Sequence, residues 1–373
     1  MKKFILLPSL LLLISGGLFI FLMGRPLKVE PNTELPFDLP APVRQAIYHA
    51  SLAPSSHNTQ MWQVWVDKPE SRLYIAIDKN RLLHIVDPLA RESYISLGAF
   101  TENLRQSLIA FGYQVQVHIE QNNKALPDSE IIIIVDYQPP AHAIDNHPQE
   151  NLSIFALRHS DKRPFLEEPL QPSSIEKLTQ ANPTHIFYFA KNEINGEYLR
   201  KNTLLAFEQQ GNNLQKRDEL AQWLRFSDEE AKEKADGLPA EQLGLSGVKK
   251  ALYYTFTDRE AAKQDNFSKQ GVDSFQKQVD GSAGFFVIVG HNSPDEWIRT
   301  GMLMQAFWLS ATSEQVALHP ISQMLEEEPF KSQIQSDLQL RLPVQMIFRA
   351  GYVDDYGKNH GIRRPLSEFV FQL

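Results

Sequence analysis

The sequence predicts an α+β protein built from two similar halves and preceded by an N-terminal transmembrane helix. Three observations lead to this prediction: strands alternate with helices in both halves, two helical segments repeat one another, and an apolar run opens the chain. The repeated segments are residues 95–117 and 298–317, each a predicted helix with an early glycine that leads into a strand. Two such halves indicate a fused pseudo-dimer of mixed architecture.

The first 24 residues contain an uncharged, mostly apolar run from Phe4 to Met23 behind two lysines. At 1.5 Å per residue this run spans about 30 Å, the thickness of a bilayer core. We therefore expect residues 1–24 to be a single-pass membrane anchor. The alternative is a cleaved signal peptide, although no good cleavage site closes the run. The flanking charges slightly favour a soluble body on the extracytoplasmic (periplasmic) side.

Proline-rich stretches divide the rest of the chain. Four prolines in residues 25–40 predict a linker. Three more in residues 138–150 mark the expected boundary between a first half, 41–150, and a second half, 151–373.

The first half begins with a predicted helix that Pro54 prevents from continuing. Alternating apolar residues predict half-buried strands, and an apolar spacing of three and four predicts a long amphipathic helix. The elements expected are helices over 41–52 and 91–112 and strands over 62–66, 73–77, 113–119 and 131–135. The last of these strands is apolar throughout, as a strand buried on both faces would be.

The second half follows the same alternation. We expect helices over 173–181, 194–225 and 294–312 and strands over 284–290, 317–320 and 344–348. Residues 216–236 are dense in charge, which is most often a solvated helix face, and residues 237–247 indicate a flexible excursion.

Composition and missing motifs exclude several functions. A net charge of -8 argues against nucleic acid as a partner. The absence of cysteine removes thiolate nucleophiles, disulfides and iron–sulfur clusters. The chain has no G-x-G-x-x-G after a strand, no P-loop and no G-x-S-x-G. No close histidine pair predicts a metal site.

Two short segments carry residues suited to a cofactor. Arg158-His159-Ser160-Asp161-Lys162 combines a guanidinium, a hydroxyl and an ammonium, groups that bind phosphate. Such a cluster is more often a solvated turn. Pro54-Ser55-Ser56-His57-Asn58-Thr59-Gln60 offers hydroxyls and amides that can bind the polar edge of a heterocycle, although many such loops are plain turns.

Together these segments resemble the hallmark motifs of the nitroreductase-like FMN flavoproteins. The resemblance extends to Trp297, Gly301 and Gln305, to His319-Pro320-Ile321-Ser322, and to Arg363-Arg364-Pro365. It covers residues 41–373 and is greatest to the fused, internally duplicated branch, some of whose members cover the flavin with a lid. Met61 stands where the family usually has proline.

The resemblance implies one FMN site shared between the halves. Arg158, Ser160 and Arg363 would hold the phosphate or ribityl chain, with Lys162 and Arg364 as helpers, and the register of the two C-terminal arginines stays open. The backbone near Ser322 would face flavin N5. The expected cofactor site is Pro54, Ser55, Ser56, Asn58, Gln60, Arg158, His159, Ser160, Lys162, Pro320, Ile321, Ser322, Arg363 and Arg364.

The function implied is an FMN-dependent oxidoreductase that takes electrons from NAD(P)H, or from a quinone-linked donor, and reduces an electron-poor small molecule. The flavin carries the chemistry, so no side chain is assigned as catalytic. The alternative is a flavin-binding or flavin-storing protein with little turnover, in which residues 211–270 form the lid. Those residues can equally be a surface insertion. Because the dimer is fused, a monomer would suffice.

Overall fold

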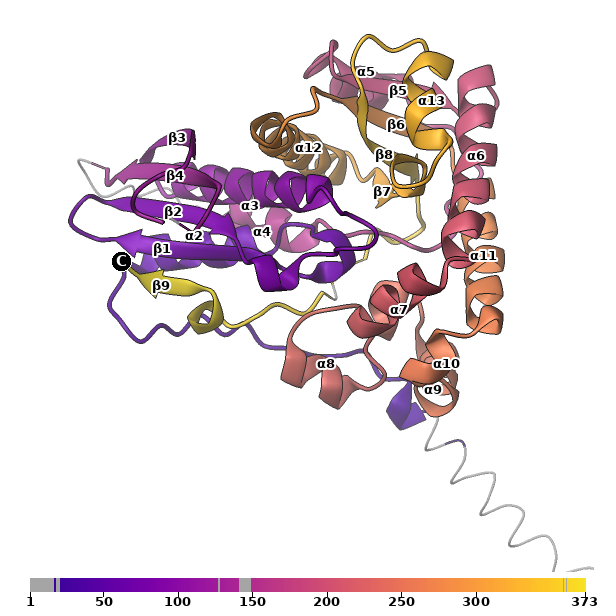
Figure 1. Ribbon diagram of the computed structural model, residues 1–373, viewed down its shortest axis with the longest axis horizontal. Coiled ribbons are helices and arrows are strands. Elements are labelled where there is room, and N and C mark those ends of the chain that lie inside the picture. The colour runs from indigo at the N-terminus through magenta and orange to yellow at the C-terminus, as the bar shows by residue number, and fades with distance from the viewer. Residues whose placement is uncertain (1–16, 18–20, 127, 141–148, 358, 360) are drawn as a thin grey trace, which may run out of the picture.

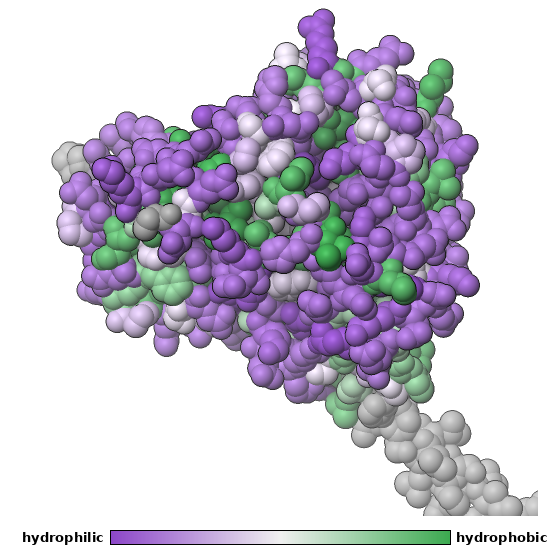
Figure 2. Space-filling view, in the orientation of Figure 1, coloured by the Kyte–Doolittle hydropathy of each residue, from purple (hydrophilic) through white to green (hydrophobic). Residues whose placement is uncertain are grey.

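The computed structural model describes residues 17, 21–126, 128–140, 149–357, 359 and 361–373. Its elements form two β-sheets, with two long helices lying side by side between them (Figure 1). The architecture is mixed α+β, in agreement with the alternation of elements along the sequence. Most of the face seen in Figure 2 is hydrophilic, and its apolar side chains gather mainly toward the middle.

The first sheet has five strands in the order β3-β4-β2-β1-β9. Four come from the first half of the chain and follow one another as antiparallel pairs: β1 (Trp62–Asp67), β2 (Arg72–Ile77), β3 (Gln114–Gln121) and β4 (Ile131–Gln138). The fifth, β9 (Val370–Gln372), is the C-terminal strand and pairs in parallel with β1. The tail of the second half therefore completes the sheet of the first half.

The second sheet has four antiparallel strands in the order β5-β6-β8-β7. They are β5 (Ile186–Ala190), β6 (Gly284–Val289), β7 (Ala317–Pro320) and β8 (Val344–Gly351). The two central strands are buried along their whole length, because both faces of the sheet are covered. Phe286 and Phe348 pack toward α12 (Pro294–Ser313), whereas Phe285 lies in a cluster with α6 and α11 on the opposite face.

The closest helix contact joins α12 to α3 (Arg91–Ala110). A Cβ atom added to Gly98 of α3 would lie 2.0 Å from the carbonyl oxygen of Ile298. A Cβ added to Gly301 of α12 would lie 1.9 Å from the carbonyl oxygen of Ile95. The contact is thus reciprocal, and only glycine lets the two backbones approach so closely.

The remaining helices surround this centre. In the first half, α2 (Ala41–Ser51) packs on α3, and α4 (Gln149–Leu157), which crosses the boundary between the halves, contacts both α3 and α12. In the second half α5 (Pro172–Gln180), α6 (Ile194–Gly211) and α13 (Phe330–Asp337) accompany the second sheet. Five further helices, drawn from rose to orange in Figure 1, run between α6 and β6: α7 (Leu214–Trp223), α8 (Asp228–Lys234), α9 (Gly247–Phe256), α10 (Arg259–Ala262) and α11 (Asp265–Asp280).

The prediction of one helix over 194–225 was wrong. The structure ends α6 at Gly211 and begins α7 at Leu214. Asn213 causes the break, because its side chain accepts hydrogen bonds from the backbone N–H groups of Gln215 and Lys216 and so caps a new helix. Residues 25–40 have no helix or strand, but Leu27 is buried with Ala231 and Ile362 and is therefore part of the packed body.

The transmembrane part of the predicted fold class needs correction. Among the described residues, no helix is both long enough and apolar enough to cross a bilayer. The apolar run on which the anchor prediction depended lies almost wholly in residues 1–16 and 18–20, which fall outside the described part. The fold is therefore α+β without a supported membrane helix, and the single-pass, extracytoplasmic localisation that depended on that helix is likewise unsupported.

Replacing Gly98 with Ala should destabilise the protein by about 2–3 kcal/mol, because the new methyl group must push α3 and α12 apart. Gly271→Ala is the matched control: this glycine lies inside α11, and its Cβ would meet only Phe207 at 3.8 Å. The control should be neutral or more stable by up to about 1 kcal/mol. Thermal unfolding of the two variants measures the difference, and equal midpoints would contradict the close contact.

Candidate functional site

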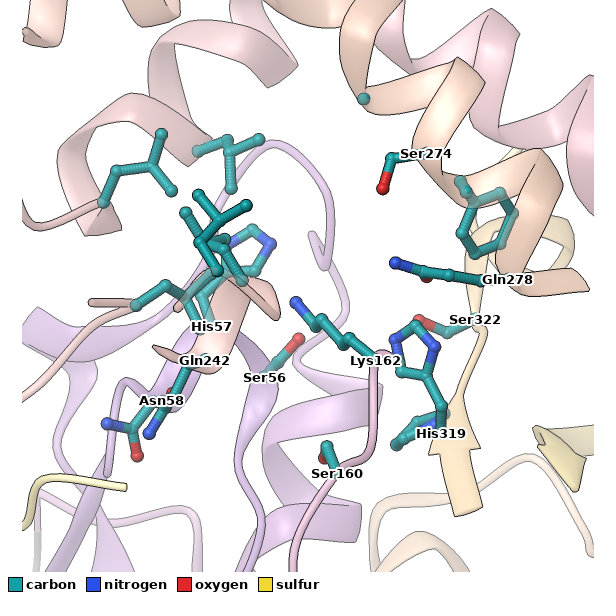
Figure 3. Close-up of a pocket in the computed structure, with 18 of the residues that line it drawn as sticks. Ser56, His57, Asn58, Ser160, Lys162, Gln242, Ser274, Gln278, His319 and Ser322 are labelled. Carbon is teal, nitrogen blue, oxygen red and sulfur yellow. The ribbon is translucent and has the colours of Figure 1, made fainter. Parts of the chain in front are cut away.

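A cavity of about 1120 Å³ lies where the two halves meet. Its walls come from the loop after α2, the segment after α4, the first turns of α3, the middle of α12, the end of β7 with the turn after it, and helices α6, α7, α9, α10 and α11. Figure 3 shows some of the lining side chains. Eleven of the fourteen residues predicted for the cofactor site line it: Pro54, Ser55, Ser56, Asn58, Arg158, His159, Ser160, Lys162, Pro320, Ser322 and Arg363.

The loop between α2 and β1 has an unusual backbone. His57, Asn58 and Gln60 all adopt left-handed conformations, with φ of 48°, 52° and 50°. Side chains hold this loop in place: Ser55 Oγ accepts from the Gln60 N–H at 3.1 Å, and Asn58 Nδ2 donates to the Gly237 carbonyl at 3.0 Å. Left-handed conformations of non-glycine residues are costly and concentrate at functional sites.

Arg158 is the most informative side chain in the cavity. It is 3% exposed, it donates from Nη2 to the Leu52 carbonyl at 2.9 Å, and its guanidinium lies 4.5 Å from the centre of the Trp308 ring. Its Nε and Nη1 atoms are buried, and no hydrogen-bond acceptor reaches them from the described residues. Burial, followed by the charge of Arg363, lowers the pKa of Arg158 to about 9. A buried cation with free donors is the binding partner an anion needs.

Two further cations face the same space. Arg363 donates to the carbonyls of Leu52 and Ala53 at the C-terminal end of α2, at 3.1 and 3.3 Å, and burial lowers its pKa to about 10. Lys162 reaches into the cavity (Figure 3) without a hydrogen-bond acceptor in the described part of the chain. Burial and the charge of Arg349 lower the pKa of Lys162 to about 8. The partial negative charge of a helix C-terminus offsets part of this positive charge.

The turn after β7 presents backbone and ring donors. Among described residues, no acceptor is found for the backbone N–H of Ser322. Arg349 Nε donates to His319 Nδ1 at 2.9 Å. Because a guanidinium does not give up its proton, the neutral His319 ring must carry its hydrogen on Nε2. Burial, together with Arg349 and Lys162, holds the pKa of His319 well below its ordinary value, so the ring stays neutral.

Three predicted site residues do not line the cavity. Gln60 is fully buried and donates to the Ala235 carbonyl at 2.9 Å, while its own side-chain oxygen accepts from the Arg364 N–H at 2.9 Å. The Arg364 side chain donates to the Gln60 and Glu368 carbonyls. Ile321 lies in the hydrophobic core beside Ile347. The register question at the C-terminus therefore has a geometric answer: Arg363 faces the cavity and Arg364 faces the protein.

The cavity also contains residues that were missing from the predicted set, among them His57, Glu92, His319 and Glu326. His57 lies in the Pro54–Gln60 motif and His319 opens the His319-Pro320-Ile321-Ser322 motif, so the sequence could have identified both as cavity residues. His57 Nδ1 is buried and finds no partner among the described residues, and burial lowers the pKa of this ring to about 4. Glu92 and Glu326 stand in ordinary polar stretches that gave no signal.

Residues 214–280, which we call the cover segment, form one wall of the cavity. Its apolar side chains at that wall include Leu220, Leu224, Leu238, Tyr253 and Phe267. Asp236 anchors it from within: both Nη atoms of Arg81 donate to Asp236 Oδ2 at 2.8 and 2.9 Å, and Arg225 binds the other oxygen. Glu219 accepts from the N–H groups of Ile85 and Val86 at 2.9 Å each. The segment is thus hydrogen-bonded to the first half.

Known proteins similar to this chain share a recurring name. No family model matches the chain. A Mycobacterium tuberculosis protein named "Putative NAD(P)H nitroreductase acg" is 28% identical over 139 residues, which are 37% of this chain and 39% of that protein. A Serratia protein named "Probable NAD(P)H nitroreductase PigM" is 23% identical over 325 residues, 81% of this chain and 86% of its own length. At low identity, these similarities support a nitroreductase-like family.

Changing Asp236 to Asn should loosen the cover segment. The buried guanidinium of Arg225 and the half-buried one of Arg81 would lose their carboxylate, which costs about 3 kcal/mol and raises local opening on the order of 100-fold. Hydrogen exchange of amides in residues 214–262 measures the effect. Glu260→Gln is the control, because its pair with Lys263 is exposed and such pairs contribute under about 1 kcal/mol. Unchanged protection in Asp236→Asn would show that other contacts hold the segment.

Proposed function

We propose that this chain binds one FMN in the cavity and acts as an NAD(P)H-dependent oxidoreductase that reduces an electron-poor acceptor such as a nitroaromatic or a quinone. The observation that carries the proposal is Arg158, a buried guanidinium whose free donors face a cavity that Lys162 and Arg363 also enter. The names of the similar proteins support the reaction class.

The residues present fit FMN on chemical grounds. The three cations suit a phosphate, and the nearby Ser160 hydroxyl suits the phosphate or the ribityl chain. In the loop after α2, Pro54, Ser55 and Ser56 line the cavity and supply an apolar ring and two hydroxyls for the face and edge of the isoalloxazine. The free Ser322 N–H and the Nε2–H of His319 are further donors.

When bound, FMN would supply the hydride chemistry, accepting two electrons from the nicotinamide and passing them to the acceptor. The chain's own groups would bind and orient the participants. A backbone donor such as the Ser322 N–H needs no reorganisation during the reaction, because its neighbours already hold it in place. A neutral His319 adds a donor to the site without adding a fourth charge.

The proposed site is shared between the halves, at one FMN per chain. The Pro54–Asn58 loop comes from residues 41–150 and the cations come from residues 151–373. The reciprocal glycine contact between α3 and α12 supports a fused, duplicated origin for these two parts. A monomer would then hold a complete site, as a homodimer does when the halves are separate chains.

The cover segment favours a second candidate, a flavin-holding protein with little turnover. It forms one wall of the cavity and is hydrogen-bonded to the loop at Asn58. A segment in that position can exclude the nicotinamide that would otherwise reduce the flavin. The two functions share the FMN site and differ only in access to it.

One experiment separates these functions. The full chain is purified, its visible spectrum is recorded, and NADPH is then added without oxygen. A yellow protein that bleaches supports the oxidoreductase, and one that stays yellow supports the flavin-holding protein. A colourless protein that FMN cannot reconstitute would contradict both.

Arg158→Ala should lose at least about 100-fold in FMN affinity, because a charge-assisted, desolvated phosphate contact contributes roughly 3 kcal/mol. Fluorescence titration with FMN measures the change. Arg299→Ala removes the same charge from an exposed position on α12, where the side chain is 62% exposed, and should bind FMN normally. Equal affinity in the two variants would place the phosphate elsewhere.

A further inference from the structure

Two carboxyl groups meet beside the proposed flavin site. Glu92 lies in the first turn of α3 and is 6% exposed. Glu326 follows the short helix η4 (Gln323–Leu325) after β7, in the other half of the chain. Both line the cavity. The proposed roles of the three cavity cations and of the loop after α2 do not involve these two carboxyl groups.

The two carboxyl groups enter the same cavity from different halves of the chain, and each shifts the pKa of the other. Two neighbouring carboxyl groups removed from water do not both ionise readily, so one of them favours holding a proton. Serine hydroxyls flank the pair: Ser56 Oγ donates to Glu92 Oε2 at 2.7 Å, and Ser322 Oγ lies 2.7 Å from Glu326 Oε1.

The surroundings decide which carboxyl holds the proton. Arg91 Nη2 lies 3.1 Å from Glu92 Oε1 and stabilises an ionised Glu92. Among the residues that the structure describes, no cation pairs with Glu326, which accepts only from Ser322 and from the Gln210 amide. Burial alone would raise the pKa of Glu92, but Arg91 and then Ser56 hold it below its ordinary value. Burial, followed by the charge of Glu92, raises the pKa of Glu326 well above its ordinary range.

The other charged groups nearby do not change this assignment. Asp87 is held by Ser93, and burial and Glu92 raise its pKa to about 6. His57 faces Glu92 from the loop and stays neutral near pH 7. Glu327, next along the chain, is paired with Lys216 of the cover segment.

We propose that Glu326, held against Glu92, stores one proton and delivers it through the Ser322 hydroxyl to the molecule being reduced. This inference rests on the proposed function. The Ser322 hydroxyl can rotate, so it can accept a hydrogen bond from the Glu326 O–H and turn its own hydrogen toward the cavity. Both serines line that cavity, and Figure 3 shows Ser56 and Ser322 at its edge.

The proton count of the reaction requires such a donor. Reduction of a quinone to a hydroquinone takes two electrons and two protons. When bound, FMN would supply a hydride, which carries both electrons and one proton and makes the first new bond to hydrogen. The second oxygen takes its proton from Ser322, and Ser322 takes one from Glu326. Glu326 is left as a carboxylate and regains a proton from solvent, so one proton is consumed in each turnover.

The test compares two acceptors on the flavin-loaded full chain. A soluble benzoquinone needs the proton, whereas ferricyanide accepts single electrons and needs none. Glu326→Gln keeps the shape of the side chain but cannot donate an acidic proton. It should slow benzoquinone reduction by about 100-fold and leave ferricyanide reduction unchanged. Glu328→Gln, two residues along and exposed, should affect neither acceptor.

An infrared measurement tests the stored proton without turnover. The protonated carboxyl of the loaded protein at pH 7 should give a carbonyl band that Glu326→Gln removes and Glu328→Gln keeps. If Glu326→Gln does not fold, Ser322→Ala takes its place in the kinetic test, since it breaks the relay and keeps both carboxyls.

Three outcomes would overturn the inference: no carbonyl band, equal loss with both acceptors, or benzoquinone reduction as fast as in the unaltered chain. A protein that binds no FMN would instead contradict the proposed function, and the infrared band would still report on the pair.

Discussion

The close approach of α3 and α12 at Gly98 and Gly301 is the constraint on which the site depends. Both helices continue from this contact to the cavity: Ile95 and Ser96 of α3 line it, and so do Met304 and Trp308 of α12. A wider helix separation would move the Trp308 ring away from Arg158 and Glu92 away from Glu326. Packed interiors transmit strain, so one methyl group added at the crossing would also displace the cavity residues that α3 and α12 carry.

The same architecture leaves the site with an excess of positive charge. Arg158 is buried and Arg363 is half-buried, both beside carbonyl groups that offset their charge only in part, and the half-buried Lys162 has no acceptor among the described residues. Burying cations without counter-ions destabilises the native state, and a bound anion restores the stability. In the function proposed above, the phosphate of FMN would remove this cost, because its negative charge would pair with the three cations.

Periodicity was sufficient to predict most of the framework. Alternating residues located β1, and three–four spacing located α3, because each pattern reports a local geometry. The motifs located the cavity cations for a similar reason, since the chemistry of phosphate binding restricts residue type. The break at Asn213 and the pairing of β9 with β1 could not be predicted, because a cap competes with helix continuation and a parallel pairing depends on distant residues.

Motif position alone could not separate ligand-facing residues from their supports. Gln60 and Arg364 occupy motif positions but bond to each other, and this bond joins the loop to the C-terminal tail. Glu92 and Glu326 are the reverse case: both line the cavity, but neither belongs to a motif, and only the folded chain brings them together. The anchor prediction is a different case: no helix among the described residues could cross a bilayer, and the apolar run behind the prediction lies almost wholly outside those residues.

The cover segment ties these parts together. Asn58 and Gln60 join the loop after α2 to this segment by hydrogen bonds, and Lys216 of the segment pairs with Glu327. A wall that excludes water strengthens the electrostatic interactions inside the cavity and also removes the usual source of protons. In the proposed function, a covered site would therefore be helped by a proton donor held beside the reacting molecule, which solvent refills between turnovers. The Glu92–Glu326 pair and the cover segment would then serve the same enclosed site.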